Sequence, residues 1–190
     1  MEKKGWQQSW VRILLTLLTA GSMIMIFCFS MQDANDSDRT SGIVTRAVIR
    51  VLYQDYADKP LNEQQQIYNE IQHIIRKCAH FSEYLLLGFL LRLCLESWFG
   101  DRVRGAWTLM MITWLAGAGY ACTDELHQLL IDGRSGQWTD VLIDFCGVVT
   151  GSVPAELITR RIPGKRHRRN REAGHPNHTA EESHGIFSEK

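Results

Sequence analysis

The sequence predicts an all-α membrane protein, a four-transmembrane-helix bundle with an extracytoplasmic helical loop and a disordered basic C-terminal tail. Three observations predict this class. Apolar residues make up 45% of the 190 residues and are gathered into four runs. None of these runs alternates between apolar and polar residues as a half-buried strand does. Basic residues border the runs at alternate ends, as expected of helices that cross a membrane in turn.

The overall composition excludes two classes of protein. The 21 Lys and Arg residues are balanced by 21 Asp and Glu residues, so the formal net charge is zero. A protein that wraps on nucleic acid needs a surplus of basic charge, and we expect no nucleic-acid partner. The apolar content is too high for a disordered chain.

The first apolar run extends from Ile13 to Met31 without a charged residue. A helix of about 20 residues spans the hydrocarbon core, so we predict a first span at about 11–31 after a cytoplasmic N-terminus, residues 1–9. The alternative is a cleaved secretory signal. The run is longer than the roughly 7–15 apolar residues of such signals, and it ends without a small-x-small cleavage site.

Three further spans are predicted at about 79–95, 106–123 and 141–158, which completes a transmembrane domain over 10–159. Small residues that allow close helix contact occur in the last two spans, namely Gly117, Gly119, Gly147 and Gly151. Pro154 is expected to kink the fourth span. The alternative for the second to fourth spans is a set of buried helices in a soluble core.

Charge orients the predicted bundle. Basic residues predominate in the N-terminus, in the connection between the second and third spans, and in the segment after the fourth span. These segments lie on one side of a four-span path, and basic loops stay in the cytoplasm. We therefore expect a cell-membrane protein that crosses the membrane several times, with both termini cytoplasmic. The tail, 160–190, has too few apolar residues to pack and is predicted to be disordered.

The long connection over 32–78 is predicted to lie outside and to contain two helices. Apolar residues recur at helical spacing from Ile43 to Leu52, with Ser41 available as an N-cap. A second apolar stripe follows Pro60 and runs into the second span. We expect these helices to form an external lid, to lie in the membrane interface, or to pack against the bundle.

The polar residues of the spans gather at the outer ends of the helices. They are Lys77, His80, Glu83 and Tyr84 of the second span, Asp124, Glu125, His127 and Gln128 of the third, Arg134 of the hairpin, and Asp140 and Asp144 of the fourth. Ionisable groups inside a membrane usually face a protein interior or an aqueous cavity. Asp140 and Asp144 are like charges one turn apart, which costs energy unless a cation or a proton offsets them. The pattern predicts a convergent polar pocket at the outer leaflet.

Four motifs resemble the VanZ-like family. They are Arg76-Lys77-Cys78-Ala79-His80-Phe81-Ser82-Glu83-Tyr84, Thr123-Asp124-Glu125-Leu126-His127-Gln128, Gly133-Arg134, and Asp140-x-x-x-Asp144-x-x-Gly147-x-x-x-Gly151. The chain departs from the family at Asp132, where Pro is frequent, and at Asp144, where Asn is common. The resemblance covers about residues 10–158. It implies a multi-pass bacterial membrane protein related to the accessory protein of low-level teicoplanin resistance, but no agreed reaction.

One hypothesis is a metal-assisted enzyme that acts on a lipid-linked envelope substrate. His80, Glu83, Asp124 and His127 are its candidate catalytic residues, with His80 or His127 as general base. Asp140 and Asp144, helped by Glu83 and Asp124, can hold a divalent cation through oxygen ligands. The cofactor is otherwise unknown. Zinc held by His80 and His127 is a further alternative, although no known zinc spacing is present.

A second hypothesis is binding or shielding without turnover. Candidate binding residues are Lys77, Tyr84, Glu125, Gln128 and Arg134, and the expected partners are membrane lipids, a lipid-linked envelope precursor or a glycopeptide. A third is purely structural, with the polar network locking the second, third and fourth spans together. A channel or proton relay is less expected, because the inner halves of the spans lack matching polar residues. A disulfide framework is not expected from the five cysteines, while a bridge between Cys78 and Cys122 stays open.

Overall fold

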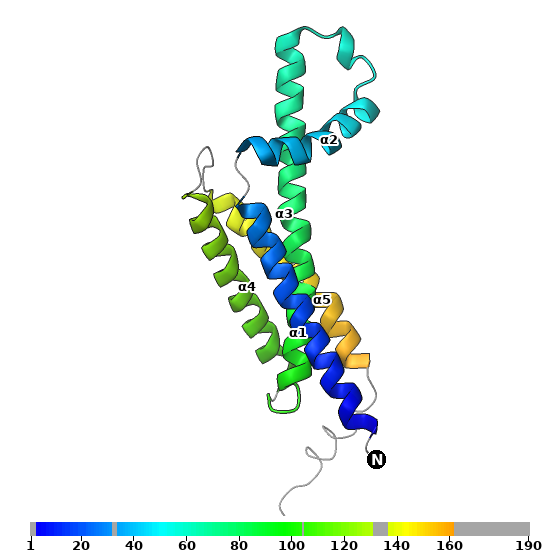
Figure 1. Cartoon of the computed structure of the whole chain (residues 1–190), viewed down its shortest axis with the longest axis vertical. Coiled ribbons are helices and arrows are strands. Elements are labelled where there is room, and N and C mark those ends of the chain that lie inside the picture. The colour runs from blue at the N-terminus through cyan, green and yellow to red at the C-terminus, as the bar shows by residue number, and fades with distance from the viewer. Residues whose placement is uncertain (1–2, 32–33, 104, 131–136, 162–190) are drawn as a thin grey trace, which may run out of the picture. The chain divides into compact units, whose positions relative to one another are not determined.

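The computed structural model describes residues 3–31, 34–103, 105–130 and 137–161, and all regular structure in these ranges is helical (Figure 1). The elements are α1 (Lys3–Ser30), α2 (Ala34–Leu52), the short 3-10 helix η1 (Tyr56–Asp58), α3 (Leu61–Phe99), α4 (Ala106–Gln128) and α5 (Trp138–Arg161). The all-α prediction is confirmed for these residues. Met1–Glu156 form one compact unit and Leu157–Lys190 a second. The predicted disordered tail falls almost entirely outside the described residues.

Three helical segments are long and apolar enough to cross a membrane, Ser9–Ser30, Leu61–Phe99 and Trp138–Arg160. Their lengths, and large exposed apolar side chains such as Leu17 and Leu142, indicate a membrane protein. Helix α4 has 23 residues but is not among these three. The count of four spans therefore stays a prediction.

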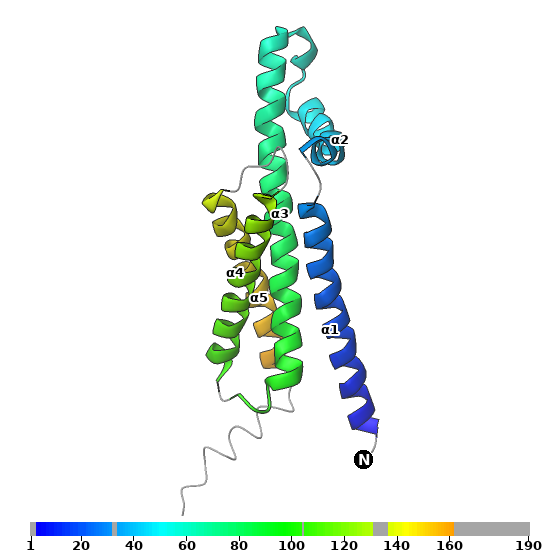
Figure 2. The ribbon, with the colours of Figure 1, turned by 60° about the vertical axis from the view of Figure 1, so that its left-hand side comes forward.

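Helices α1, α4 and α5 and the second half of α3 run side by side (Figures 1 and 2). The buried core between them consists of Ile26, Tyr84, Leu87, Ala121 and Val148. Each of the four helices supplies at least one of these side chains. The core is therefore shared by the whole bundle and positions the outer ends of the helices relative to one another.

Glycines bring α3 and α5 into backbone contact, as the predicted small-residue spacing requires. A Cβ atom on Gly151 would lie 1.9 Å from the Leu85 carbonyl oxygen, and one on Gly147 would lie 2.6 Å from the Phe81 carbonyl oxygen. Only glycine permits so close an approach. Gly117 of α4 packs on a valine side chain, but a Cβ on Gly119 would meet nothing within 4 Å. The expectation that Gly119 serves a close helix contact is wrong, because it lies on an exposed side of α4.

The predicted outer stripe and second span form one continuous helix, α3, of 39 residues. No proline or glycine interrupts α3 before Gly88, and Pro60 stands immediately before its first residue. At 1.5 Å per residue α3 is about 58 Å long, roughly twice the thickness of the hydrocarbon core. Its second half, from about His80, is sufficient to cross the core. Its first half extends beyond the ends of α1 and α4 (Figure 1).

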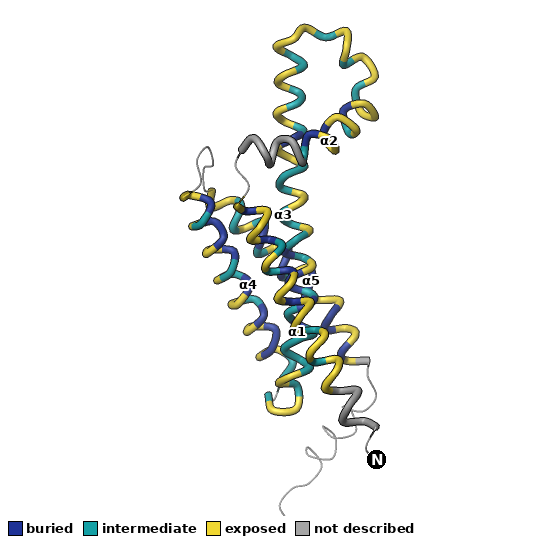
Figure 3. Tube along the Cα trace, viewed as in Figure 1, coloured by how far each residue is buried: buried dark blue, intermediate teal, exposed yellow. Residues whose placement is uncertain are grey.

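Helix α2 crosses the first half of α3, and both are largely exposed in this region (Figure 3). The Gln72 amide donates to the Ser41 hydroxyl at 3.3 Å, and Thr45 and Ile49 are buried. The helix begins at Ala34, so Ser41 is not its N-cap as the sequence suggested. Ser41 lies inside the helix, and its hydroxyl contacts α3.

A buried ion pair links α3 and α5 near their C-terminal ends. The guanidinium of Arg92, 1% exposed, donates to Glu156 and, at 3.0 Å, to Glu96. The expectation that the inner halves of the helices lack matching polar residues is therefore wrong. In the sequence, Arg92 and its glutamate partners resemble charges that flank a span on the cytoplasmic side. Nothing local shows that Arg92 meets a glutamate 64 positions away. All five cysteines are free.

Candidate functional site

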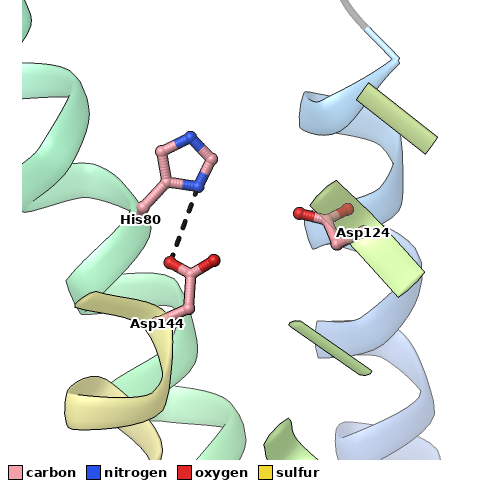
Figure 4. Close-up of side chains that lie close together, drawn as sticks. All are labelled: His80, Asp124 and Asp144. Atoms are coloured by element: carbon pink, nitrogen blue, oxygen red, sulfur yellow. Dashed lines mark ion pairs between the residues drawn. The ribbon is translucent and has the colours of Figure 1, made fainter. Parts of the chain in front are cut away.

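Polar side chains from three helices converge at the end of the bundle where α4 ends and α5 begins. His80 of α3, Asp124 of α4 and Asp144 of α5 each offer a nitrogen or oxygen atom, and these atoms all lie within 4.8 Å of one another (Figure 4). Nδ1 of His80 lies 3.9 Å from Oδ1 of Asp144. We call these three residues together with Tyr84 the three-helix site.

The glycine contacts explain why α3 and α5 contribute adjacent residues. Gly147 is one turn from Asp144 and touches the backbone at Phe81, next to His80. The close backbone approach at this level brings the two polar side chains within reach of each other. The valine that packs on Gly117 places α4 against the same pair of helices.

Three of the four side chains of the site are buried. Tyr84 is 0% exposed, Asp144 1% and Asp124 3%, whereas the His80 side chain retains 19% exposure. The carboxylate of Asp124 faces the other two residues across the bundle (Figure 4). His80 is therefore the most accessible side chain of the site.

Several buried oxygens at this end have no hydrogen-bond partner among the residues that the structure describes. They are both carboxylate oxygens of Asp144, Oδ1 of Asp124, and the hydroxyl oxygens of Tyr84 and Ser30. Oδ2 of Asp124 accepts a hydrogen bond from the Gln128 amide at 3.2 Å. A buried polar atom without a partner costs about 1–3 kcal/mol, so an accumulation of them in one place requires an explanation.

Negative charge dominates the surroundings of Asp144. Four other carboxylates, those of Asp124, Glu125, Asp140 and Glu83, act on it electrostatically. The described basic groups nearby are His80, at 3.9 Å, and Lys77, which pairs with Asp140 at 3.4 Å. The two aspartates of the predicted like-charge pair therefore have different surroundings. Asp140 pairs with a lysine, whereas Asp144 lies beside Asp124 and His80.

Two further predicted residues have structural contacts of their own. Glu125 is buried and accepts a hydrogen bond from the backbone N–H of Gln137 at 2.5 Å, which ties α4 to the segment leading into α5. His127 stacks on Phe27 of α1, with ring centroids 4.8 Å apart. His127 therefore contacts α1 and is not in the group formed by His80, Asp124 and Asp144. Arg134 lies outside the described residues.

Helix α1 contributes to this end of the bundle, although none of its residues was among the predicted site residues. Ser30 is 2% exposed, and the Tyr120 hydroxyl donates to the Met23 carbonyl at 2.6 Å. A signal for this was present, since Thr19, Ser22, Ile26 and Ser30 repeat at helical spacing and are all buried. Small hydroxyl residues at that spacing indicate the packed face of a membrane helix.

Comparison with known proteins gives one match. A family model described as VanZ/LLP1 matches residues 15–159, which extend from α1 into α5 and include every residue of the three-helix site. No curated protein and no solved structure matches the chain.

Proposed function

The chain belongs to the VanZ/LLP1 family, and we propose that it binds a cell-envelope lipid or a peptidoglycan-related ligand at the three-helix site. Such binding shields the ligand and contributes to low-level resistance to glycopeptides such as teicoplanin. The observation that carries the proposal is the set of buried oxygens without described partners on Tyr84, Asp124 and Asp144. A bound ligand that satisfies these atoms removes the cost of burying them.

The chemistry of the site restricts what can bind. Its carboxylate and hydroxyl oxygens favour hydrogen-bond donors and positive charge. The positive charge comes either from an ammonium group of the ligand or from a cation bound together with an anionic ligand. Envelope lipids, peptidoglycan precursors and glycopeptides carry groups of both kinds. The exposed side of His80 is where the rest of such a molecule extends.

We propose the membrane topology on charge and length. Helix α4 runs alongside the three apolar helices and has 23 residues, enough for a crossing (Figure 2). With four crossings, the basic segments before α1, between α3 and α4, and after α5 all lie in the cytoplasm. The three-helix site then lies at the outer leaflet, where envelope lipids and glycopeptides are accessible.

The test measures binding by the full chain in lipid nanodiscs. Teicoplanin and a lipid-linked peptidoglycan precursor are titrated against the wild type and against the double variant H80A/D124A. We expect the double variant to lose at least about tenfold in affinity for one of the two ligands. Glu70→Gln on the exposed first half of α3 is the matched control, since it removes one carboxylate away from the site. Equal binding by the double variant and the wild type contradicts the proposal.

Turnover of a lipid-linked envelope substrate is the second candidate. The observation in its favour is the convergence of one imidazole and two carboxylates, in which His80 can act as a general base. Mass spectrometry of the same nanodisc samples after prolonged incubation separates the two functions. Accumulation of a product with the wild type, but not with the double variant, supports the enzyme, whereas recovery of unchanged ligand supports binding.

A further inference from the structure

We propose that the three-helix site binds one divalent first-row transition metal ion, with Zn²⁺ preferred. The ligands are a ring nitrogen of His80 and one carboxylate oxygen each of Asp124 and Asp144. This inference rests on the binding function proposed above and names the cation in it. The metal links the protein to an anionic oxygen, such as a phosphate, of the envelope ligand.

The geometry needs only small adjustments to close around an ion. At metal–ligand distances of ~2.1 Å, two tetrahedral ligand atoms lie ~3.4 Å apart. The His80–Asp144 pair, at 3.9 Å, is ~0.5 Å wider than this, and since all the atoms lie within 4.8 Å, no pair of the group is more than ~1.4 Å wider. Side-chain rotation covers such differences without moving the helices.

Two independent observations point to a ligand at this place. Asp124 and Asp144 are at least nine-tenths buried, and three of their four carboxylate oxygens have no hydrogen-bond partner within the described parts of the chain. Two like charges in one buried site also disfavour each other, so that a cation or a shared proton must offset them. A divalent ion satisfies the oxygens and balances the charge together.

The ligand atoms, and the side chain that holds one of them in place, indicate the kind of metal. Imidazole favours Zn²⁺ and related transition metals over Ca²⁺ and Mg²⁺, which prefer oxygen ligands alone. The Gln128 amide donates to Oδ2 of Asp124 at 3.2 Å and leaves Oδ1 without a hydrogen-bond partner among the described residues. Residues behind metal ligands commonly hold them in this way. Three protein ligands leave a fourth position open, as in zinc sites that bind substrates or water.

The experiment uses the full chain in detergent, stripped with a chelator and then titrated with Zn²⁺, Mn²⁺, Ca²⁺ and Mg²⁺ by calorimetry. We expect one Zn²⁺ per chain, weaker Mn²⁺, and no saturable binding of Ca²⁺ or Mg²⁺. Asp144→Asn and Asp124→Asn should each weaken Zn²⁺ binding by at least about tenfold. Glu70→Gln, which removes a carboxylate outside the site, should leave the affinity within about twofold. Circular dichroism of each metal-free variant verifies folding.

Asp140→Asn distinguishes this site from the pair of aspartates on α5 alone. Because Asp140 pairs with Lys77, its loss should weaken Zn²⁺ binding far less than loss of Asp124. If Asp140→Asn abolishes binding while Asp124→Asn does not, the three-residue site is wrong. Absence of saturable Zn²⁺ binding by the folded wild type overturns the proposal outright and leaves a shared proton to offset the charge.

The metal and the envelope ligand are separated by one further measurement, binding of the lipid-linked precursor with and without chelator. Loss of binding on chelation and its recovery with Zn²⁺ supports a metal that links protein and ligand. Unchanged binding of the precursor after chelation overturns the inference that the metal links protein and ligand, but leaves the binding function intact. Saturable Zn²⁺ without any binding of the precursor or teicoplanin supports the metal site and contradicts the binding function.

Discussion

Substitution of Gly151 by alanine tests how the helices assemble the three-helix site. The added Cβ would lie 1.9 Å from the Leu85 carbonyl oxygen, 2.8 Å from its carbon and 3.0 Å from the Phe89 nitrogen. All three are backbone atoms, so no side-chain rotation relieves the contact. A carbon atom approaches a carbonyl oxygen to ~3.3 Å, and α3 and α5 must therefore separate by ~1.4 Å at this level.

The separation affects both stability and the site. Overpacking in a well-packed core costs about 1–3 kcal/mol, and a contact against backbone belongs at the upper end of that range. Alanine recovers about 1 kcal/mol through its higher helix propensity. We expect Gly151→Ala to lower the free energy of unfolding by about 2 kcal/mol. The 3.9 Å approach of His80 to Asp144, two turns along α5, should widen and weaken Zn²⁺ binding.

The assay is denaturant unfolding of the purified protein in mixed micelles, followed by circular dichroism, with Zn²⁺ titration of the same samples. Gly119→Ala on α4 and Gly21→Ala on α1 are matched controls, because a Cβ at either position meets nothing within 4 Å. Both should be neutral or slightly stabilising. If Gly151→Ala is as stable as these controls and keeps the wild-type affinity for Zn²⁺, the reasoning from backbone contact is refuted.

Three other predictions use different parts of the molecule. Glu156→Gln removes a partner of a buried arginine and should destabilise the protein by about 3 kcal/mol, whereas Glu96→Gln, at a side chain 16% exposed, should cost less in the same unfolding assay. Asp144→Asn should leave the metal-free unfolding temperature unchanged or higher, but should remove at least about half of the stabilisation of about 2.7 kcal/mol expected of the wild type at a Zn²⁺ concentration one hundred times its Kd; a zinc-induced shift of undiminished size contradicts it. In intact cells a variant that keeps Cys78, which is exposed, as its single cysteine should react with a membrane-impermeant maleimide, and a variant whose single cysteine is introduced by Ser9→Cys should react only after permeabilisation; the reverse pattern excludes the proposed orientation.

Properties that depend on neighbouring residues were predictable from the sequence alone. The uncharged run from Ile13 indicated a spanning helix because length and composition decide whether a helix can cross the hydrocarbon core. The spacing of Gly147 and Gly151 indicated a close helix contact because helical periodicity places residues four apart on one face. The same periodicity placed His80 and Tyr84 together on the second predicted span.

The partners of each polar residue were decided only by the tertiary structure. Asp144 was paired in the sequence with Asp140, one turn away, but it faces Asp124 and His80 from two other helices. Nothing local showed that Arg92 would meet Glu156. Periodicity determines which residues share a face of one helix, but the rotation of one helix against another depends on how their side chains pack. Here the contact of glycines with the α3 backbone sets that rotation and thereby assembles the site.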